Sequence, residues 1–317
     1  MVYMVTGGSG CVGAYVIRDL IEKGKKVVNF DQNLQTNILQ QVISREAISE
    51  IQMVQGDISD FHHLCRAVKS NKVDVIIHLA SLQIPASNAN PPAAVNIVTG
   101  GLVNVLEACR ILDVKKVVWS SSIAVFGTAE EYGNKKVENS AHHRPQSVYG
   151  ACKSLGEYLL SYYYDQYGVN STGLRFTAIY GVGRERGLSS FTTEMIRKVS
   201  NDEPYQVPFA DDKIDWQFVE DVAAITIIAA EAGKTKTRIF NTQGDVRKVT
   251  DGIDYLEKLM PSAQLAPNPG KFGIAWEYDT TPLEEELGFV PKYSMEKGIL
   301  KTLNQYLMMA GKNEIIS

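Results

Sequence analysis

The stretch TGGSGCVG, residues Thr6–Gly13, lies between the apolar run Val2–Thr6 and the segment Cys11–Lys23, where apolar residues recur at helical spacing. Small residues in a strand-to-helix turn let the phosphates of a ligand come close to the backbone. The first turn of the following helix offers free N–H groups and the positive end of the helix dipole. We therefore expect the chain to begin with a strand, a pyrophosphate-binding turn and a helix.

Short β-branched runs and helical patterns continue to alternate as far as Phe176. The further expected strands are Lys26–Asp31, Ile51–Gln55, Val73–Leu79, Lys115–Ser121 and Ser171–Phe176. The further expected helices are Phe61–Lys69, Ala93–Leu112 and Ser147–Tyr167. This alternation is typical of parallel strands joined by right-handed helical crossovers, with helices on both faces of the sheet. The predicted fold class is α/β, a doubly wound parallel sheet of the Rossmann type.

The alternation weakens after Phe176, and prolines punctuate the rest of the chain. We expect a smaller, mostly C-terminal lobe, residues 177–217 and 242–317, that binds the substrate. Residues 1–176 form the expected dinucleotide-binding domain. A helix at Phe218–Ala232 and a strand at Arg238–Asn241 are expected to return to it, so that residues 218–241 belong with it.

The composition is that of an ordinary globular protein, with 44% hydrophobic and 21% charged residues among 317. A net charge of −4 gives no attraction to nucleic acid or to an anionic membrane, so neither is an expected partner. The four cysteines form no CxxC pair and no metal-ligand spacing, so we expect no metal and a reducing compartment. Neither a signal peptide nor an apolar run of membrane-spanning length is expected, which favours a soluble, cytoplasmic protein.

Asp31 ends the second expected strand, downstream of the glycine-rich turn at the spacing typical of a ribose-binding carboxylate. Such a carboxylate accepts hydrogen bonds from the adenosine ribose hydroxyls and repels a 2′-phosphate. No arginine directly follows Asp31 that would bind such a phosphate. The expected cofactor is therefore NAD and not NADP.

Tyr149 and Lys153 are four residues apart near the start of an expected helix, so their side chains lie on one face. An ammonium beside a phenol favours the phenolate and is expected to lower the pKa of Tyr149 from about 10 toward neutrality. Such a tyrosine can take a proton from an alcohol while a cofactor accepts the hydride. Ser120, Ser121 and Ser122 end the preceding strand, where a hydroxyl can hold the reacting oxygen.

Together these motifs resemble the extended short-chain dehydrogenase/reductase family, also called the NAD-dependent epimerases/dehydratases, along nearly the whole chain. The family's motifs match, in chain order, Thr6–Gly13, Asp31, Asp57-Ile58, His78-Leu79-Ala80, Ser122–Gly127, and Tyr149 with Lys153. By this resemblance Tyr149 is the general acid/base, Lys153 also holds the nicotinamide ribose, and Ser122 binds the substrate oxygen. The residues assigned to the cofactor are Gly7, Gly10, Cys11, Val12, Gly13, Asp31, Gln32, Asp57, Ile58, Leu79, Ala80, Ser81, Tyr149, Lys153 and Phe176. Those assigned to the substrate are Ser81, Ser122, Ile123 and Thr177.

Members of this family dehydrate, epimerise, or oxidise and reduce their substrates. Dehydrating relatives carry an acidic pair directly after the serine, where this chain has Ile123 and Ala124, so dehydration is not expected. Relatives resembling UDP-galactose 4-epimerase carry an asparagine and an arginine that contact the nucleotide diphosphate, where this chain has Ala178 and Ile214. We therefore expect an NAD-dependent oxidoreductase acting on a secondary alcohol or ketone of a small or medium polar substrate.

Two alternatives stay open. A 4-epimerase of a sugar or sugar nucleotide uses the same hydride step, and Arg184, Arg186 or Lys213 could replace the missing diphosphate contacts. A non-catalytic NAD-binding protein is the third interpretation, which the presence of both Tyr149 and Lys153 disfavours. Parts of the chain also resemble short-chain L-threonine dehydrogenases, but this similarity fades after Phe176, in the part of the chain that is expected to bind the substrate.

The resemblance also implies an oligomeric state. In relatives, the helices that match residues 93–112 and 147–167 pair with their copies in a dimer. We therefore expect a homodimer through these two helices.

Overall fold

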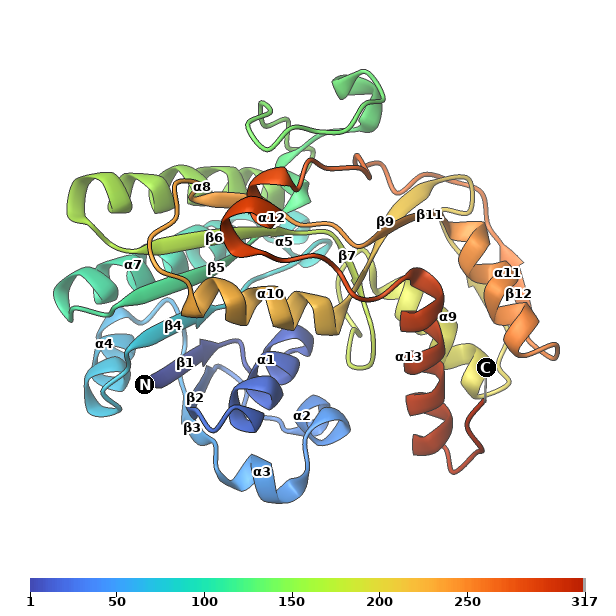
Figure 1. Cartoon of the computed structure of the whole chain (residues 1–317), viewed down its shortest axis with the longest axis horizontal. Coiled ribbons are helices and arrows are strands. Elements are labelled where there is room, and N and C mark those ends of the chain that lie inside the picture. The colour runs from blue at the N-terminus through green and yellow to red at the C-terminus, as the bar shows by residue number, and fades with distance from the viewer. Residues whose placement is uncertain (316–317) are drawn as a thin grey trace.

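Seven parallel strands form the central sheet of the computed structural model, which describes residues 1–315 (Figure 1). Their order is β10-β6-β5-β4-β1-β2-β3. The strands are β1 (Val2–Thr6), β2 (Lys26–Asp31), β3 (Gln52–Gln55), β4 (Val75–His78), β5 (Lys116–Ser122), β6 (Ser171–Phe176) and β10 (Ile239–Asn241). The chain runs outward from β1 in both directions, so a crevice opens at the carboxyl ends of β1 and β4. The predicted doubly wound α/β fold is confirmed.

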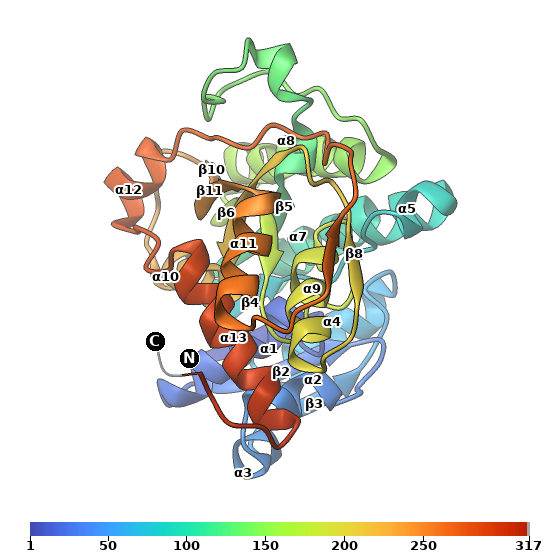
Figure 2. The same cartoon turned by 90° about the vertical axis from the view of Figure 1, so that its right-hand side faces the viewer.

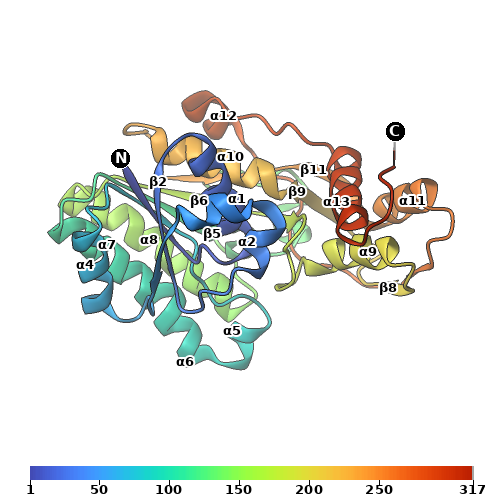
Figure 3. The ribbon, with the colours of Figure 1, turned by 90° about the horizontal axis from the view of Figure 1, so that it is seen from below.

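Helices cover both faces of this sheet (Figure 3). One face carries α1 (Cys11–Glu22) and α10 (Val219–Glu231), and the other carries α4 (Phe61–Ser70), α7 (Gly101–Ile111) and α8 (Val148–Tyr167). Side chains alternate across β1, so that Tyr3 and Val5 belong to the first layer of the core and Met4 belongs to the second. Both layers are apolar, because a parallel sheet buried on two faces has no polar side.

The helix before β5 is longer than expected. It runs from Pro91 to Ile111 through α6 (Pro91–Ala94), a π-helical turn η1 (Val95–Gly100) and α7. By length and composition alone this helix could cross a membrane, which corrects our expectation that no such run exists. Half of it is buried within the fold, where it packs against α4 and α8. Core helices of globular domains meet the same criterion, since their buried side is equally apolar.

A smaller lobe lies beside the carboxyl edge of the sheet (Figure 1) and stands in front of the sheet in Figure 2. It contains a three-stranded sheet of β7 (Ala178–Tyr180), β9 (Lys213–Phe218) and β11 (Asp245–Lys248), and a two-stranded sheet of β8 (Tyr205–Val207) and β12 (Leu265–Pro267). Its helices are α9 (Ser190–Ser200), α11 (Val249–Leu259) and α13 (Met295–Met309). A further helix, α12 (Thr281–Leu287), packs near β10.

The expected elements agree with the structure to within two residues at most ends. The structure adds α2 (Asn37–Val42) and α3 (Arg45–Ser49) between β2 and β3. Sequence periodicity missed them because they are short and bury a single residue between them, Leu39. β10 pairs with β6 and α10 packs against α1, while the assignment of residues 218–241 to the large domain stays a prediction. The boundary after Phe176 stays a prediction.

Candidate active site

The glycine-rich turn joins β1 to α1 at close quarters. Gly7 has a φ of +73°, and a Cβ atom there would lie 2.7 Å from the backbone nitrogen of Ala80. A Cβ atom on Gly13 would lie 2.5 Å from the carbonyl oxygen of Gly7. The Gly10 N–H donates to the Gly7 carbonyl (3.1 Å), and α1 begins directly afterwards. Only glycine fits at Gly7 and Gly13, and the result is a bare backbone cradle at a helix N-terminus that suits a pyrophosphate.

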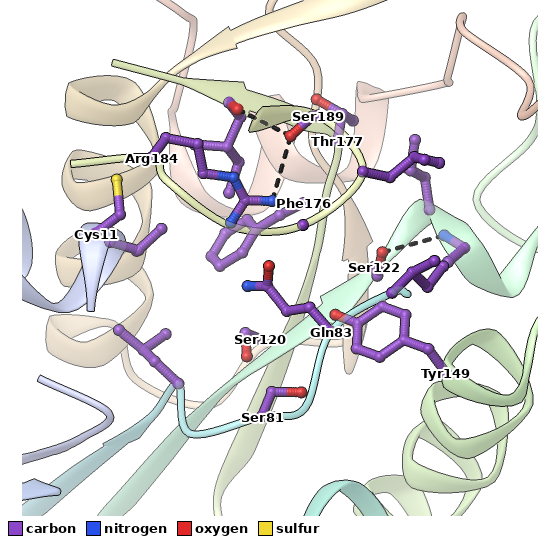
Figure 4. Close-up of a pocket in the computed structure, with 18 of the residues that line it drawn as sticks. Cys11, Ser81, Gln83, Ser120, Ser122, Tyr149, Phe176, Thr177, Arg184 and Ser189 are labelled. Carbon is purple, nitrogen blue, oxygen red and sulfur yellow. Dashed lines mark hydrogen bonds between the residues drawn. The ribbon is translucent and has the colours of Figure 1, made fainter. Parts of the chain in front are cut away.

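An open cavity of about 940 Å³ lies in front of this turn (Figure 4). Its walls come from the glycine-rich turn, the ends of β4, β5 and β6, the start of α8, and two segments of the smaller lobe, 184–189 and 272–274. The expected site residues that line it are Gly7, Gly10, Cys11, Val12, Gly13, Leu79, Ser81, Ser122, Ile123, Tyr149, Phe176 and Thr177. Residues far apart in the sequence thus meet at one crevice.

Tyr149 enters the cavity from the first turn of α8. Ser147 caps this helix, because its hydroxyl accepts a hydrogen bond from the Gly150 N–H (3.0 Å). A Cβ atom on Gly150 would lie 2.0 Å from the carbonyl oxygen of Ala124, so only glycine lets α8 approach the end of β5 this closely. This approach brings the Tyr149 side chain toward Ser81 and Ser122, as Figure 4 shows.

The pKa of Tyr149 is raised, which corrects the expectation that Lys153 lowers it. Burial is the largest cause, because it disfavours the charged phenolate. The cation that acts against burial is Arg184 of the smaller lobe, with smaller contributions from hydrogen bonds of Ser122 and Ser81. The four-residue spacing predicted that Lys153, on the same helix, stabilises the phenolate. The cation that does so is Arg184, from another part of the chain.

Lys153 lies beneath Tyr149 and does not line the cavity. Its side chain is fully buried, and Nζ donates a hydrogen bond to the Ser120 carbonyl. Nζ also lies 4.6 Å from the centroid of the Trp119 ring and 5.3 Å from that of Tyr149. Burial lowers the pKa of Lys153 to about 7. Its contact with the nicotinamide ribose stays a prediction.

Arg184 has a more central place than the sequence indicated, where it was one of three cations that could replace the missing diphosphate contacts. It lines the cavity, and its Nη2 donates to the Ser189 hydroxyl (3.2 Å). With the Gln83 amide oxygen turned toward it, that oxygen accepts from Nη1 at 3.1 Å. Within residues 1–315 it forms no ion pair with a carboxylate, and its Nε has no hydrogen-bond partner. A guanidinium at a cavity wall that has no carboxylate partner and a free N–H group can bind an anion.

Only folding revealed this position. Arg184 lies in the loop 181–189, far in sequence from every motif residue, and carries no motif of its own. The two other cations that could replace the missing diphosphate contacts lie outside the cavity. Lys213 and Arg186 are exposed, and neither lines the cavity. Ile214 is almost fully buried in the smaller lobe, so it offers nothing to a diphosphate.

The remaining expected cofactor residues lie outside this cavity. Asp31 accepts hydrogen bonds from the backbone of Ser9 (3.0 Å) and Asn33 (3.1 Å), which fixes it beside the glycine-rich turn. Asp57 accepts from the N–H (2.8 Å) and hydroxyl (2.7 Å) of Ser59. Gln32 is exposed, Ile58 is buried against Gly101, and Ala80 packs on Gly7. Their contacts with the adenosine half of the cofactor stay predictions.

Comparison with known proteins agrees with this architecture. Residues 3–242 match the model of the NAD dependent epimerase/dehydratase family. UDP-glucuronate 4-epimerase 1 of Arabidopsis thaliana is 26% identical over 98% of this chain and 77% of its own length. A partial consensus L-threonine 3-dehydrogenase superposes with a TM-score of 0.86 at 20% identity, over 97% of this chain and 100% of that one. UDP-glucose 4-epimerase of Thermus thermophilus in complex with NAD superposes with a TM-score of 0.83 at 24% identity, over 96% and 99%.

The fold and its crevice define an NAD-dependent enzyme of the extended short-chain dehydrogenase/reductase type. The chain belongs to the NAD-dependent epimerase/dehydratase family. The glycine cradle fits this cofactor, because glycine at positions 7 and 13 lets β1, the turn and α1 pack closely and leaves backbone N–H groups free at the N-terminus of α1 for its phosphates.

We expect Asp31→Ala to weaken the preference for NADH over NADPH by about tenfold or more, since a charge-assisted hydrogen bond contributes roughly 1.5–3 kcal/mol. The carboxylate lies at the end of β2, beside the phosphate cradle. Fluorescence titration of both reduced cofactors measures the two dissociation constants. Gln35→Ala, an exposed change in the following loop, is the control. A wild-type protein that already prefers NADPH would contradict the role of Asp31.

Proposed function

We propose that this protein is an NAD-dependent oxidoreductase that acts on a secondary alcohol or ketone of a small or medium polar substrate carrying a carboxylate. One observation carries this proposal. The side chains of Tyr149, Ser122 and Arg184 line a single cavity that the glycine cradle also lines, with Arg184 on the side of Cys11 and Tyr149 across from it (Figure 4). A proton-transfer group, an oxygen-binding hydroxyl and an anion-binding guanidinium thus share one crevice with the expected cofactor site.

Each side chain has a distinct task in this reaction. NAD held at the glycine cradle would supply the hydride acceptor for the carbinol carbon. The Ser122 hydroxyl holds the substrate oxygen, and Tyr149 takes the proton that this oxygen loses. Because burial raises the pKa of Tyr149, the phenolate is disfavoured near neutral pH, and the groups that stabilise it become important. Arg184 lowers the cost of the phenolate and orients the substrate at the same time.

The carboxylate is inferred from the chemistry of Arg184. A guanidinium that lacks a protein carboxylate gains most from a planar anion that accepts two parallel hydrogen bonds. Some of the relatives' names point the same way, since UDP-glucuronate and L-threonine both carry a carboxylate, whereas the UDP-glucose named for others does not. The relatives' substrates differ greatly in size, so they support the charged group and not a particular molecule.

A 4-epimerase of a sugar or sugar nucleotide is the second candidate. Several curated relatives are named UDP-glucuronate or UDP-glucose 4-epimerases, which favours it. Against a nucleotide diphosphate stands the apolar, buried character of Ala178 and Ile214, where such relatives have polar contacts. A protein that only binds NAD is disfavoured, because Tyr149 and Ser122 are both present and close together.

The two candidates are separated by following NADH at 340 nm across a panel of hydroxy acids, amino acids with a hydroxyl group, uronates and neutral sugars. UDP-glucuronate and UDP-glucose are incubated in parallel and analysed for inverted product. Net NADH with a carboxylate-bearing alcohol is the expected result. Inverted UDP-sugar without net NADH would establish the epimerase, and turnover of neutral alcohols alone would remove the carboxylate from the proposal.

A homodimer is also proposed. Large apolar side chains are exposed on α8 and on the adjacent helix 91–111, among them Tyr158 (65% exposed), Val95 (53%) and Leu155 (48%). Because these two helices pack against each other, the exposed side chains lie on neighbouring elements, and large exposed apolar surfaces mark protein–protein contacts. A location in the cytoplasm stays a prediction from the sequence.

Tyr158→Glu is expected to convert the dimer to monomers, because it places a charge where two copies of α8 would meet. Analytical ultracentrifugation at several concentrations measures the mass directly, and Glu285→Gln on the exposed side of α12 is the control. A wild-type protein that sediments as a monomer at high concentration would rule out this interface.

A further inference from the structure

A buried carboxylate, Glu157, lies on α8 one turn beyond Lys153 and is only 4% exposed. Its Oε1 accepts hydrogen bonds from the Ser121 hydroxyl (2.5 Å) and from Arg175 Nε (2.9 Å). Its Oε2 accepts from Arg175 Nη2 (2.8 Å) and lies 3.1 Å from His143 Nε2. One carboxylate therefore ties α8 to the ends of β5 and β6, directly behind the catalytic residues.

Arg175 is itself held on all sides. Its Nη1 donates to the Asn139 carbonyl (2.8 Å) and to Asn241 Oδ1 (2.9 Å), and its guanidinium lies 4.8 Å from the centroid of the Phe126 ring. Burial would raise the pKa of Glu157, but the bonds from His143 and Arg175 lower it to about 2. The carboxylate thus stays ionised across the working range of pH.

Lys153 lies on the same side of α8, one turn earlier, with no solvent around its ammonium. Burial is what lowers its pKa, and the charge of Glu157 is the largest influence acting in the opposite direction. Cys152 on α8 acts weakly in the same direction as Glu157. Tyr149 lies above on α8, and His78 faces Lys153 from β4, where burial lowers the pKa of the imidazole to about 3 and keeps it neutral.

We propose that Glu157 is a positioning residue of the active site, whose negative charge stabilises the Lys153 ammonium and whose hydrogen bond from Ser121 holds the end of β5 against α8. The Ser121 hydroxyl donates to Glu157, the carbonyl of the preceding Ser120 accepts from Lys153, and the following Ser122 faces Tyr149, so the clamp acts at the middle of the three serines. The consequence for turnover rests on the proposed function. The consequence for the charge of Lys153 does not.

The test is Glu157→Gln, which keeps the shape of the side chain and removes its charge. The protein is labelled with ¹³C at lysine Cε, and the Lys153 signal, assigned by its loss in Lys153→Arg, is followed from pH 5 to 10. Without the negative charge the ammonium is less stable, so the midpoint should fall from near 7 by about one pH unit or more. Glu286→Gln, which removes a hydrogen-bonded carboxylate on α12, is the matched control and should leave the midpoint unchanged.

With an active substrate, kcat of Glu157→Gln at pH 7.5 should fall about tenfold, since above the midpoint a one-unit shift lowers the ammonium fraction tenfold. The alkaline limb of the pH profile should move to lower pH, while KM and the NADH dissociation constant change less than twofold. A purely structural role would lower thermal stability and leave the profile and the NMR midpoint in place, and that result would overturn the proposal.

Removing one partner of a buried ion pair can prevent folding. The double variant Glu157→Gln/Arg175→Gln leaves no unpaired charge, and its Lys153 midpoint should fall by less than that of Glu157→Gln, because the Arg175 cation is lost as well. If no substrate is turned over by the wild-type protein, the proposed function fails. The NMR midpoint then decides the role of Glu157 alone.

Discussion

Tyr149→Phe is expected to lower kcat by about 10³-fold, within the range of 10²–10⁴ that a positioned acid or base contributes. The variant keeps the ring that packs at the start of α8 and loses only the hydroxyl that faces Ser122 and Ser81. The dissociation constant of NADH should change less than twofold, because the glycine cradle lines the cavity on the side of Cys11, away from Tyr149 (Figure 4). Steady-state rates and fluorescence titration measure the two quantities separately.

The control for this variant is Tyr164→Phe, which removes a phenolic hydroxyl from the same helix, where the ring lies against Arg238. Its kcat should stay within twofold of the wild type. Unchanged turnover in Tyr149→Phe would contradict the assignment of Tyr149 as the acid/base. An equal loss in both variants would show that the helix, and not one hydroxyl, limits the reaction.

Arg184→Gln is expected to raise KM for a carboxylate-bearing substrate by about 100-fold, because losing a charge-assisted, two-point contact costs roughly 3 kcal/mol. A smaller loss in kcat should accompany it, since Arg184 also favours the Tyr149 phenolate. The measurement compares KM for the carboxylate substrate with KM for its neutral amide, which should hardly change.

Arg186→Gln is the matched control, because Arg186 is exposed and lies two residues away in the same loop. Its KM should equal that of the wild type. If Arg184→Gln affects the carboxylate and the amide equally, the guanidinium shapes the cavity without reading the charge. The proposed substrate class would then be wrong, whereas the assignment of a hydride-transfer reaction would still stand.

The two variants report on different kinds of residue. Tyr149 belongs to a local motif, which the four-residue spacing to Lys153 and the preceding serines made recognisable. Arg184 belongs to a loop whose place is set by β7, α9 and a hydrogen bond to Ser189. Local patterns can be read from the chain, whereas the approach of two distant loops depends on the packing of the whole smaller lobe.

The same division applies to electrostatics. A spacing of four residues correctly places Tyr149 and Lys153 on one face of α8, but it says nothing about the surrounding dielectric. In the folded protein burial raises the pKa of Tyr149 and lowers that of Lys153 to about 7. Burial thus favours the neutral forms of both Tyr149 and Lys153. Arg184 opposes this effect at Tyr149, and Glu157 opposes it at Lys153.

What the sequence determined by itself is the α/β alternation, the phosphate cradle, the strand-two carboxylate and the Ser–Tyr–Lys set, because each is encoded by neighbours a few residues apart. Only the tertiary structure decided which cation faces the phenol, that Lys153 lies beneath the cavity, and that Glu157 is clamped by Arg175. Those contacts join segments that lie far apart in the chain, and their strength comes from the exclusion of water, which exists only once the sheet, its helices and the smaller lobe have packed together.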